Sequence, residues 1–126
     1  MSIVELNEAT FQAAVEGGKP LIIDFWAPWC GPCRQFAPVF DAAAAKHPEV
    51  TFAKVNTEEE QELSAGLRIR SIPTLMVFRD NVLLFSQAGA LSASQLDELI
   101  EQVQAVDMEK VHAEIAAQQN QAPDQA

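Results

Sequence analysis

Two cysteines separated by two residues constrain this chain more than any other feature. They are its only cysteines, and they stand in the segment Trp29-Cys30-Gly31-Pro32-Cys33. An apolar run over residues 21–25 precedes the segment and predicts a buried strand. Apolar side chains at helical spacing follow it and predict a helix. A Cys-x-x-Cys pair at such a strand-to-helix junction is typical of a redox-active dithiol.

The position of the first cysteine favours its thiolate form. Cys30 falls at the expected exposed start of the helix, where free backbone N–H groups and the helix dipole stabilise a negative sulfur. Cys33 follows about one helical turn later, close enough to close a small disulfide ring. The thiolate is the form that attacks disulfides. We therefore interpret Cys30 as the candidate nucleophile.

Four further segments, together with the cysteine motif, resemble a known family. They are residues 24–27, 54–56, 72–74 and 89–92. Together with the Trp-Cys-Gly-Pro-Cys motif they resemble the thioredoxin family, and the resemblance extends from about residue 3 to about residue 105. The central motif is highly specific. The resemblance implies a thioredoxin fold, which is a five-stranded sheet flanked by four helices.

The apolar pattern is compatible with that α/β fold. The spacing predicts a mixed sheet with helices on both faces, because βα units alternate with one hairpin. Expected strands cover residues 3–6, 21–25, 51–56, 74–78 and 82–86. Expected helices follow Asn7, the cysteine motif, Glu58 and the capping-box pattern that begins at Ser92.

The end of the chain departs from the family pattern, because thioredoxins typically end near residue 105. We expect a thioredoxin domain over residues 1–105 and a C-terminal extension over residues 106–126. Met108, Val111 and Ile115 form an apolar stripe that predicts a short helix. The Gln- and Ala-rich residues 118–126 predict disorder.

The resemblance assigns roles around the cysteines. It implies that Cys33 resolves the mixed disulfide formed by Cys30, and that Gly31 and Pro32 tune the pair toward reduction. Glycine permits close approach of a partner, and proline is tolerated in a first helical turn. Trp29 is interpreted as a flat apolar docking surface.

A second loop is expected to face the cysteines. On propensity alone, Pro73 is trans, since few X-Pro bonds are cis. The resemblance instead implies a cis bond after Ile72, whose backbone pairs with an extended substrate segment. Gly89 and Ala90 are then expected to form the opposite wall of the groove.

Asp24 is the one charged residue in its apolar strand. If the strands neighbour each other, period-2 alternation allows it to meet Lys54 inside the protein. A buried carboxyl is costly unless it is paired or protonated. One hypothesis is a structural ion pair with Lys54. The other is a proton acceptor for Cys33, acting through water.

Alternatives to a redox role find less support in the residues. A purely structural disulfide is disfavoured because a two-residue loop offers little stabilisation. We expect no metal, because zinc usually takes four ligands and neither His47 nor His112 has ligand spacing to the motif. A disulfide oxidase or isomerase, and a non-catalytic binding or chaperone-like subunit, remain open as other functions.

The net charge and the hydropathy pattern disfavour several classes of binding partner. A net charge of −10 argues against nucleic acid and an anionic membrane surface. No apolar run is long enough to span a membrane, and the N-terminus lacks a signal-peptide pattern. We therefore expect the protein to be cytoplasmic, and we also expect it to be a monomer. In the cytoplasm, a lone cysteine pair is more often catalytic than structural.

The resemblance also implies an activity and an electron source. It predicts a general protein-disulfide reductase acting on disulfide-containing protein substrates. No bound cofactor is expected, and NADPH would supply electrons through a flavoprotein thioredoxin reductase.

Three positions differ from many thioredoxins, which carry glycine where Arg68, Ser71 and Asn81 stand. Arg34, Arg68 and Arg70 are three of only eight basic residues, and all lie on segments near the expected site. They are either solvated rim charges or a local basic collar that biases partner choice.

Overall fold

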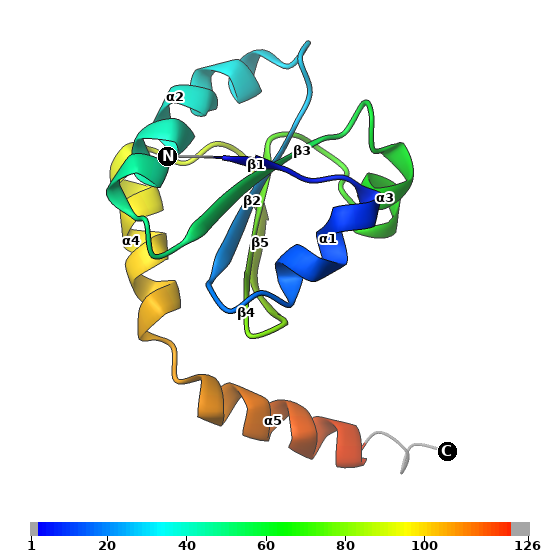
Figure 1. The fold of residues 1–126 in the computed structure, drawn as a ribbon, viewed down its shortest axis with the longest axis vertical. Helices are drawn as coiled ribbons and strands as arrows, with labels where there is room; N and C mark the ends of the chain where they lie inside the picture. Colours follow the sequence, from blue (N-terminus) through cyan, green and yellow to red (C-terminus); the bar gives the residue numbers. More distant parts are fainter. Residues whose placement is uncertain (1–2, 122–126) are drawn as a thin grey trace.

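The computed structural model describes residues 3–121, which form one five-stranded sheet with helices on both faces (Figure 1). The strands are β1 (Val4–Glu5), β2 (Leu21–Trp26), β3 (Thr51–Asn56), β4 (Thr74–Arg79) and β5 (Val82–Ala88). The helices are α1 (Glu8–Val15), α2 (Gly31–Lys46), α3 (Gln61–Gly66), α4 (Ala93–Ala105) and α5 (Met108–Gln121). The predicted mixed α/β fold is confirmed.

The sheet order β1-β3-β2-β4-β5 places β2 at the centre. β1, β3 and β2 run parallel, whereas β4 is antiparallel to both β2 and β5. β2 is buried on both faces, which explains its nearly continuous apolar sequence. The cysteine motif follows the carboxyl end of this central strand, so the most rigid part of the sheet positions it.

Two apolar layers cover the sheet. On one face, Phe36 and Phe40 of α2 and Leu96 and Ile100 of α4 pack over Ile22 and its neighbours. On the other face, the side chains of α1 and α3 cover a second set of sheet residues. These are Ile23, Phe25, Ala53, Val55, Met76 and Phe78. The alternation along β2 therefore divides its side chains between two cores.

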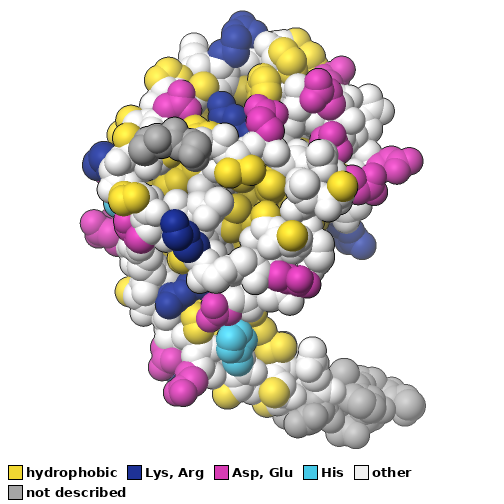
Figure 2. Space-filling model, in the orientation of Figure 1, with side chains coloured by type: hydrophobic (Ala, Val, Ile, Leu, Met, Phe, Trp, Pro, Cys, Tyr) yellow, Lys and Arg dark blue, Asp and Glu magenta, His cyan; other side chains and the backbone are white. Residues whose placement is uncertain are grey.

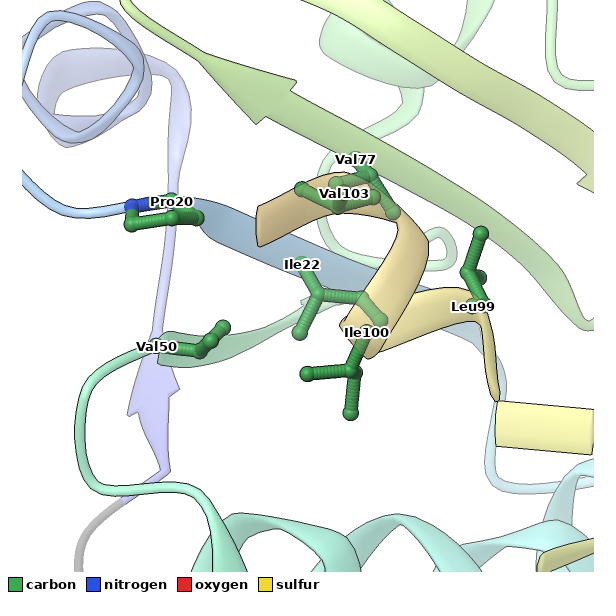
Figure 3. Close-up of a pocket in the computed structure, with 7 residues that line it drawn as sticks. All are labelled: Pro20, Ile22, Val50, Val77, Leu99, Ile100 and Val103. Atoms are coloured by element: carbon green, nitrogen blue, oxygen red, sulfur yellow. The ribbon is translucent and has the colours of Figure 1, made fainter. Parts of the chain in front are cut away.

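A small apolar cavity lies between the sheet and α4 (Figure 3). Its volume is about 10 Å³, at the lower limit for one water molecule. Its lining residues are Pro20, Ile22, Val50, Val77, Leu99, Ile100 and Val103. The cavity is a gap in core packing, because neither cysteine nor any polar side chain lines it.

Local signals account for several element boundaries. Asn7 and Ser92 cap α1 and α4 as predicted. In each cap, the side chain accepts a hydrogen bond from the backbone N–H of the third helical residue, and the side chain of that residue accepts one from the backbone N–H of the cap. The hairpin turn uses Asp80 and Asn81, both with positive φ, which these short polar residues tolerate. α3 begins at Gln61 and not at Glu58, because the preceding N–H groups donate to Asn56 in a turn.

The C-terminal extension is more ordered than predicted. α5 continues to Gln121, so the expectation of disorder from residue 118 is wrong for residues 118–121; residues 122–126 lie outside the described part. Alanine and glutamine are good helix formers, which explains the continuation. Asp107 caps the helix through the Lys110 N–H. Figure 1 shows α5 extending from the end of α4, beyond the hairpin end of the sheet.

Candidate active site

Cys30 and Cys33 form a disulfide at the start of α2, with their Cα atoms 5.2 Å apart. Cys30 is the N-cap residue in extended conformation, and its Sγ accepts a hydrogen bond of 3.2 Å from the Cys33 N–H. The residue thus occupies the helix position that stabilises negative charge on sulfur. The expectation that Cys30 is exposed is wrong for this state, since only 5% of the residue is accessible. Ala27, Trp26 and Ile72 pack around the pair.

Gly31 and Pro32 form the first turn of α2. A Cβ atom added at Gly31 would have no heavy atom of another residue within 4 Å. Packing within this chain therefore does not require glycine there.

The loop before β4 lies against the disulfide. The bond between Ile72 and Pro73 is cis, as the family resemblance implies. Cys30 Sγ lies 3.8 Å from the carbonyl oxygen of Ile72. The Pro73 carbonyl accepts a hydrogen bond of 2.8 Å from the N–H of Gly89, which has a φ of 106°. The structure thus connects the Ile72 loop to exposed Gly89 and Ala90, which lie beyond the end of β5.

Trp29 is the most exposed large apolar residue of the site, at 64%. A surface pocket of about 180 Å³ lies beside it. The pocket is lined by Trp29, Thr57, Ser64, Ile69, Arg70, Ser71 and Ile72. The sequence interpretation had not identified Thr57, Ser64 or Ile69 as site residues. No local pattern marks them, because they reach the pocket from the end of β3, from α3 and from the loop after α3.

Asp24 is buried beneath the site, with 1% of its surface accessible. Neither carboxylate oxygen has a hydrogen-bond partner within the described residues. Burial raises the pKa of Asp24 from 3.8 to about 7; Lys54 opposes the shift, and Asp41 adds to it. A carboxyl group with a pKa near neutrality can exchange a proton under physiological conditions.

Lys54 does not neutralise this carboxyl group directly. The two residues are paired in the β2–β3 register, but no ion pair between them exists within the described part of the chain. Lys54 Nζ instead lies 5.5 Å from the ring centroid of Trp26. The indole Nε1 of Trp26 is also buried without a partner among the described residues. Two unsatisfied polar side chains thus adjoin the cysteine motif on the central strand.

Within residues 3–121, no group of three or more His, Cys, Asp or Glu side chains could hold a metal ion. No described helix is long and apolar enough to cross a membrane.

The fold and the site together define a thiol–disulfide oxidoreductase. The Thioredoxin family model matches residues 2–118, so the chain belongs to the thioredoxin family. It is 46% identical over 121 residues to putative thioredoxin 2 of Streptomyces coelicolor, covering 96% of this chain and 90% of that protein. It is 44% identical over 93 residues to thioredoxin 1 of Synechococcus elongatus, covering 72% and 87%.

A solved thioredoxin structure from Malassezia sympodialis supports the same assignment. It aligns with a TM-score of 0.72 and 32% identity, covering 80% of this chain and 90% of that one. The predicted family, fold and disulfide-reductase activity are therefore confirmed. The match to the Streptomyces protein covers nearly the whole chain, so it reaches into the C-terminal extension.

Proposed function

We propose that this protein is a general protein-disulfide reductase in which Cys30 attacks and Cys33 resolves. The observation that carries the proposal is the asymmetry of the pair. Cys30 is the N-cap of α2 and its sulfur adjoins the Ile72 carbonyl, whereas Cys33 lies inside the first turn. A helix N-terminus lowers a thiol pKa, and a thiolate attacks disulfides faster than a thiol.

The reaction consumes one substrate disulfide and two protein thiols. The Cys30 thiolate attacks one sulfur of the substrate, forming a mixed disulfide and releasing the first substrate thiolate. Cys33 then loses its proton and attacks the Cys30 sulfur. The second substrate thiolate leaves and is protonated. The substrate gains two electrons and two protons, and the protein is left with the Cys30–Cys33 disulfide.

Asp24 is proposed to accept the Cys33 proton, through a water molecule. Its buried, unpaired carboxylate and its pKa of about 7 support that role. Lys54 is assigned a supporting part, because its positive charge opposes the rise in the Asp24 pKa.

The substrate is proposed to lie across Trp29, Ile72, Gly89 and Ala90. The exposure of Trp29 and the proximity of Ile72 to the Cys30 sulfur support this path. The extended substrate backbone would pair with that of Ile72, which cis Pro73 positions.

Several features of the biological setting are also proposals. Electrons come from NADPH through a flavoprotein thioredoxin reductase, and the protein itself carries no bound cofactor. The protein works as a cytoplasmic monomer, since a reducing compartment keeps such a dithiol reduced. Residues 1–105 form the catalytic domain, and residues 106–126 are an appendage to it.

Trapping experiments test the assignment of the two cysteines. Cys33→Ser should accumulate mixed disulfides with a protein substrate, because the attacking thiol remains and the resolving thiol is missing. Cys30→Ser should accumulate almost none. Non-reducing gels measure both, with the double Cys30→Ser, Cys33→Ser variant as the control for nonspecific adducts. Equal trapping by the two single variants would refute the assignment.

A further inference from the structure

Two arginines beside the active site are unpaired in a strongly acidic protein. The chain carries 18 acidic and eight basic residues, yet exposed Arg68 and Arg70 form no ion pair within residues 3–121. The ion pairs found there use Lys46 and His47. Arg34, the third arginine near the disulfide, donates to the Pro28 carbonyl at 2.9 Å. The free guanidinium charge therefore lies on the loop between α3 and β4.

Arg68 has an unfavourable backbone conformation. Its φ of 61° lies in the left-handed region, and its N–H donates to the Ala65 carbonyl at the end of α3. A glycine would adopt this conformation without steric cost. The conformation belongs to the C-terminal cap of α3, because the next N–H, of Ile69, donates back to the Ser64 carbonyl. Glycine is the usual residue at such a position, so Arg68 adds a positive charge after α3 at a steric cost.

Arg70 places its charge at the pocket beside the disulfide. It lines the 180 Å³ hollow together with Trp29 and Ile72, the proposed substrate-contacting residues. Ser64 lines the same hollow, but its hydroxyl oxygen is buried away from the surface. The pocket thus combines an apolar wall with a positive rim.

The charge around α3 is strongly polarised. Acidic side chains gather over the side of the molecule on which α3 lies, whereas basic side chains are few (Figure 2). A separate hollow before and within α3 is lined by glutamates, namely Glu8, Glu58, Glu59, Glu60 and Glu62. The arginines follow α3 in the chain, and Arg70 lines the pocket beside the disulfide, which contains no acidic lining residue. An acidic ligand is therefore favoured near Arg70.

We propose that Arg70, assisted by Arg68, selects substrate disulfides that carry a carboxylate side chain next to the reacting cysteine. The inference rests on the proposed reductase function, and it adds a substrate class to it. The carboxylate pairs with the Arg70 guanidinium while the neighbouring substrate cysteine reaches Cys30. At physiological salt the Debye length is about 8 Å, so charges farther away than this are screened more than the direct contact.

Matched peptide disulfides test this selectivity. Three disulfide-linked peptide dimers differ only in the two residues beside the cysteine, which are Glu, Gln or Lys. Pre-reduced protein is mixed with each peptide in 0.15 M salt, and the second-order rate constant is followed by tryptophan fluorescence. The variants are Arg70→Gln and Arg68→Gln. Lys110→Gln is the control, because it removes one exposed positive charge on α5.

For the unmodified protein, the Glu peptide should react about three to ten times faster than the Gln peptide, with the Lys peptide slowest. The ratio of the Glu to the Gln peptide should fall to within about twofold of unity in Arg70→Gln, and part of the way in Arg68→Gln. Lys110→Gln should keep the full ratio. In every protein that prefers the Glu peptide to the Gln peptide, molar salt should reduce that preference.

The outcomes separate this inference from the function on which it rests. Efficient reduction of all three peptides without a Glu preference would overturn the inference and leave the reductase function intact. An equal loss of the ratio in Arg70→Gln and Lys110→Gln would also overturn it, since only net charge would then matter. A protein that reduces none of the peptides would refute the proposed function itself.

Discussion

Polar side chains at the two ends of the sheet differ in their hydrogen bonding. At the redox end, the Asp24 carboxylate, the Trp26 indole N–H and the Ser64 hydroxyl have no partner among the described residues. At the other end, Arg79 is the last residue of β4, and the two N–H bonds of its Nη1 atom are shared among three carbonyl oxygens. The acceptors are Val103, Gln104 and Val106, at 2.8, 3.2 and 3.1 Å.

This difference in hydrogen bonding indicates that the fold gains stability at the Arg79 end of the sheet and loses some at the redox end. Buried polar groups are normally hydrogen-bonded, and each exception in a native structure needs an explanation. Here the exceptions adjoin the disulfide or the pocket beside it, and the Asp24 carboxyl group among them is the proposed proton acceptor. The satisfied end instead fixes α4 against the sheet. Disturbing the two ends should therefore have opposite effects on stability, and only changes at the redox end should lower activity.

The largest effect is expected at Asp24. Asp24→Asn should raise the free energy of unfolding of the oxidised protein by about 1–4 kcal/mol at pH 8, because it removes a poorly compensated buried charge. It should also slow resolution of the mixed disulfide by about tenfold to a hundredfold, because the proton acceptor is lost. Denaturant melts and stopped-flow reduction of a protein disulfide measure the two effects.

The pH dependence of that stability difference has a defined sign. The folded-state pKa of Asp24 is about 7, above its ordinary value of 3.8, so the native state holds the proton more tightly than the unfolded chain. Native protein therefore loses stability relative to Asp24→Asn as the pH rises from about 4 to about 7, and the difference is constant above that. A variant that is less stable and equally fast would make Asp24 a structural ion-pair partner.

A smaller effect of opposite sign is expected at the satisfied end. Arg79→Met should lower the free energy of unfolding by about 1.5–3 kcal/mol, the range for hydrogen bonds made by a charged group. The methionine keeps much of the apolar stem, so the lost hydrogen bonds dominate. Disulfide reduction should stay within about twofold, since Arg79 lies at the end of β4 opposite the cysteines. Denaturant melts and insulin reduction measure both.

A matched substitution controls for the loss of a positive charge. Lys110→Met removes the exposed charge on α5 and should change stability by less than about 0.5 kcal/mol. If Arg79→Met lost as much activity as Asp24→Asn, the two ends would be coupled and the contrast between them would fail.

Local sequence signals predicted much of this molecule. Asn7 indicated a helix start through its residue type, and Ser92 did so through the capping-box pattern with Gln95. Asp24 stood out because a charge interrupts an apolar strand, and its burial is confirmed. The cysteine motif indicated the redox site because spacing alone brings both thiols to one helical turn.

The remaining features depend on contacts between distant parts of the chain. Arg79 reaches carbonyl groups about 25 residues away, so no local pattern could indicate its role. Ser64 belongs to the pocket only because α3 packs beside the Ile72 loop. The burial of Cys30 likewise depends on Ile72, which follows it by 42 residues. These three features result from tertiary packing, which the periodicity of the sequence does not predict.

The smallest effect is expected from removal of residues 106–126, the proposed appendage. Truncation after Ala105 should leave insulin reduction within about twofold and lower the free energy of unfolding by at most about 1–2 kcal/mol. The cost is not zero, because truncation removes one Arg79 acceptor, the Val106 carbonyl, and buried Met108. Truncation after Asp107 keeps that carbonyl and should recover part of the loss. A deficit above about 3 kcal/mol, or a large loss of activity, would show that α5 belongs to the domain.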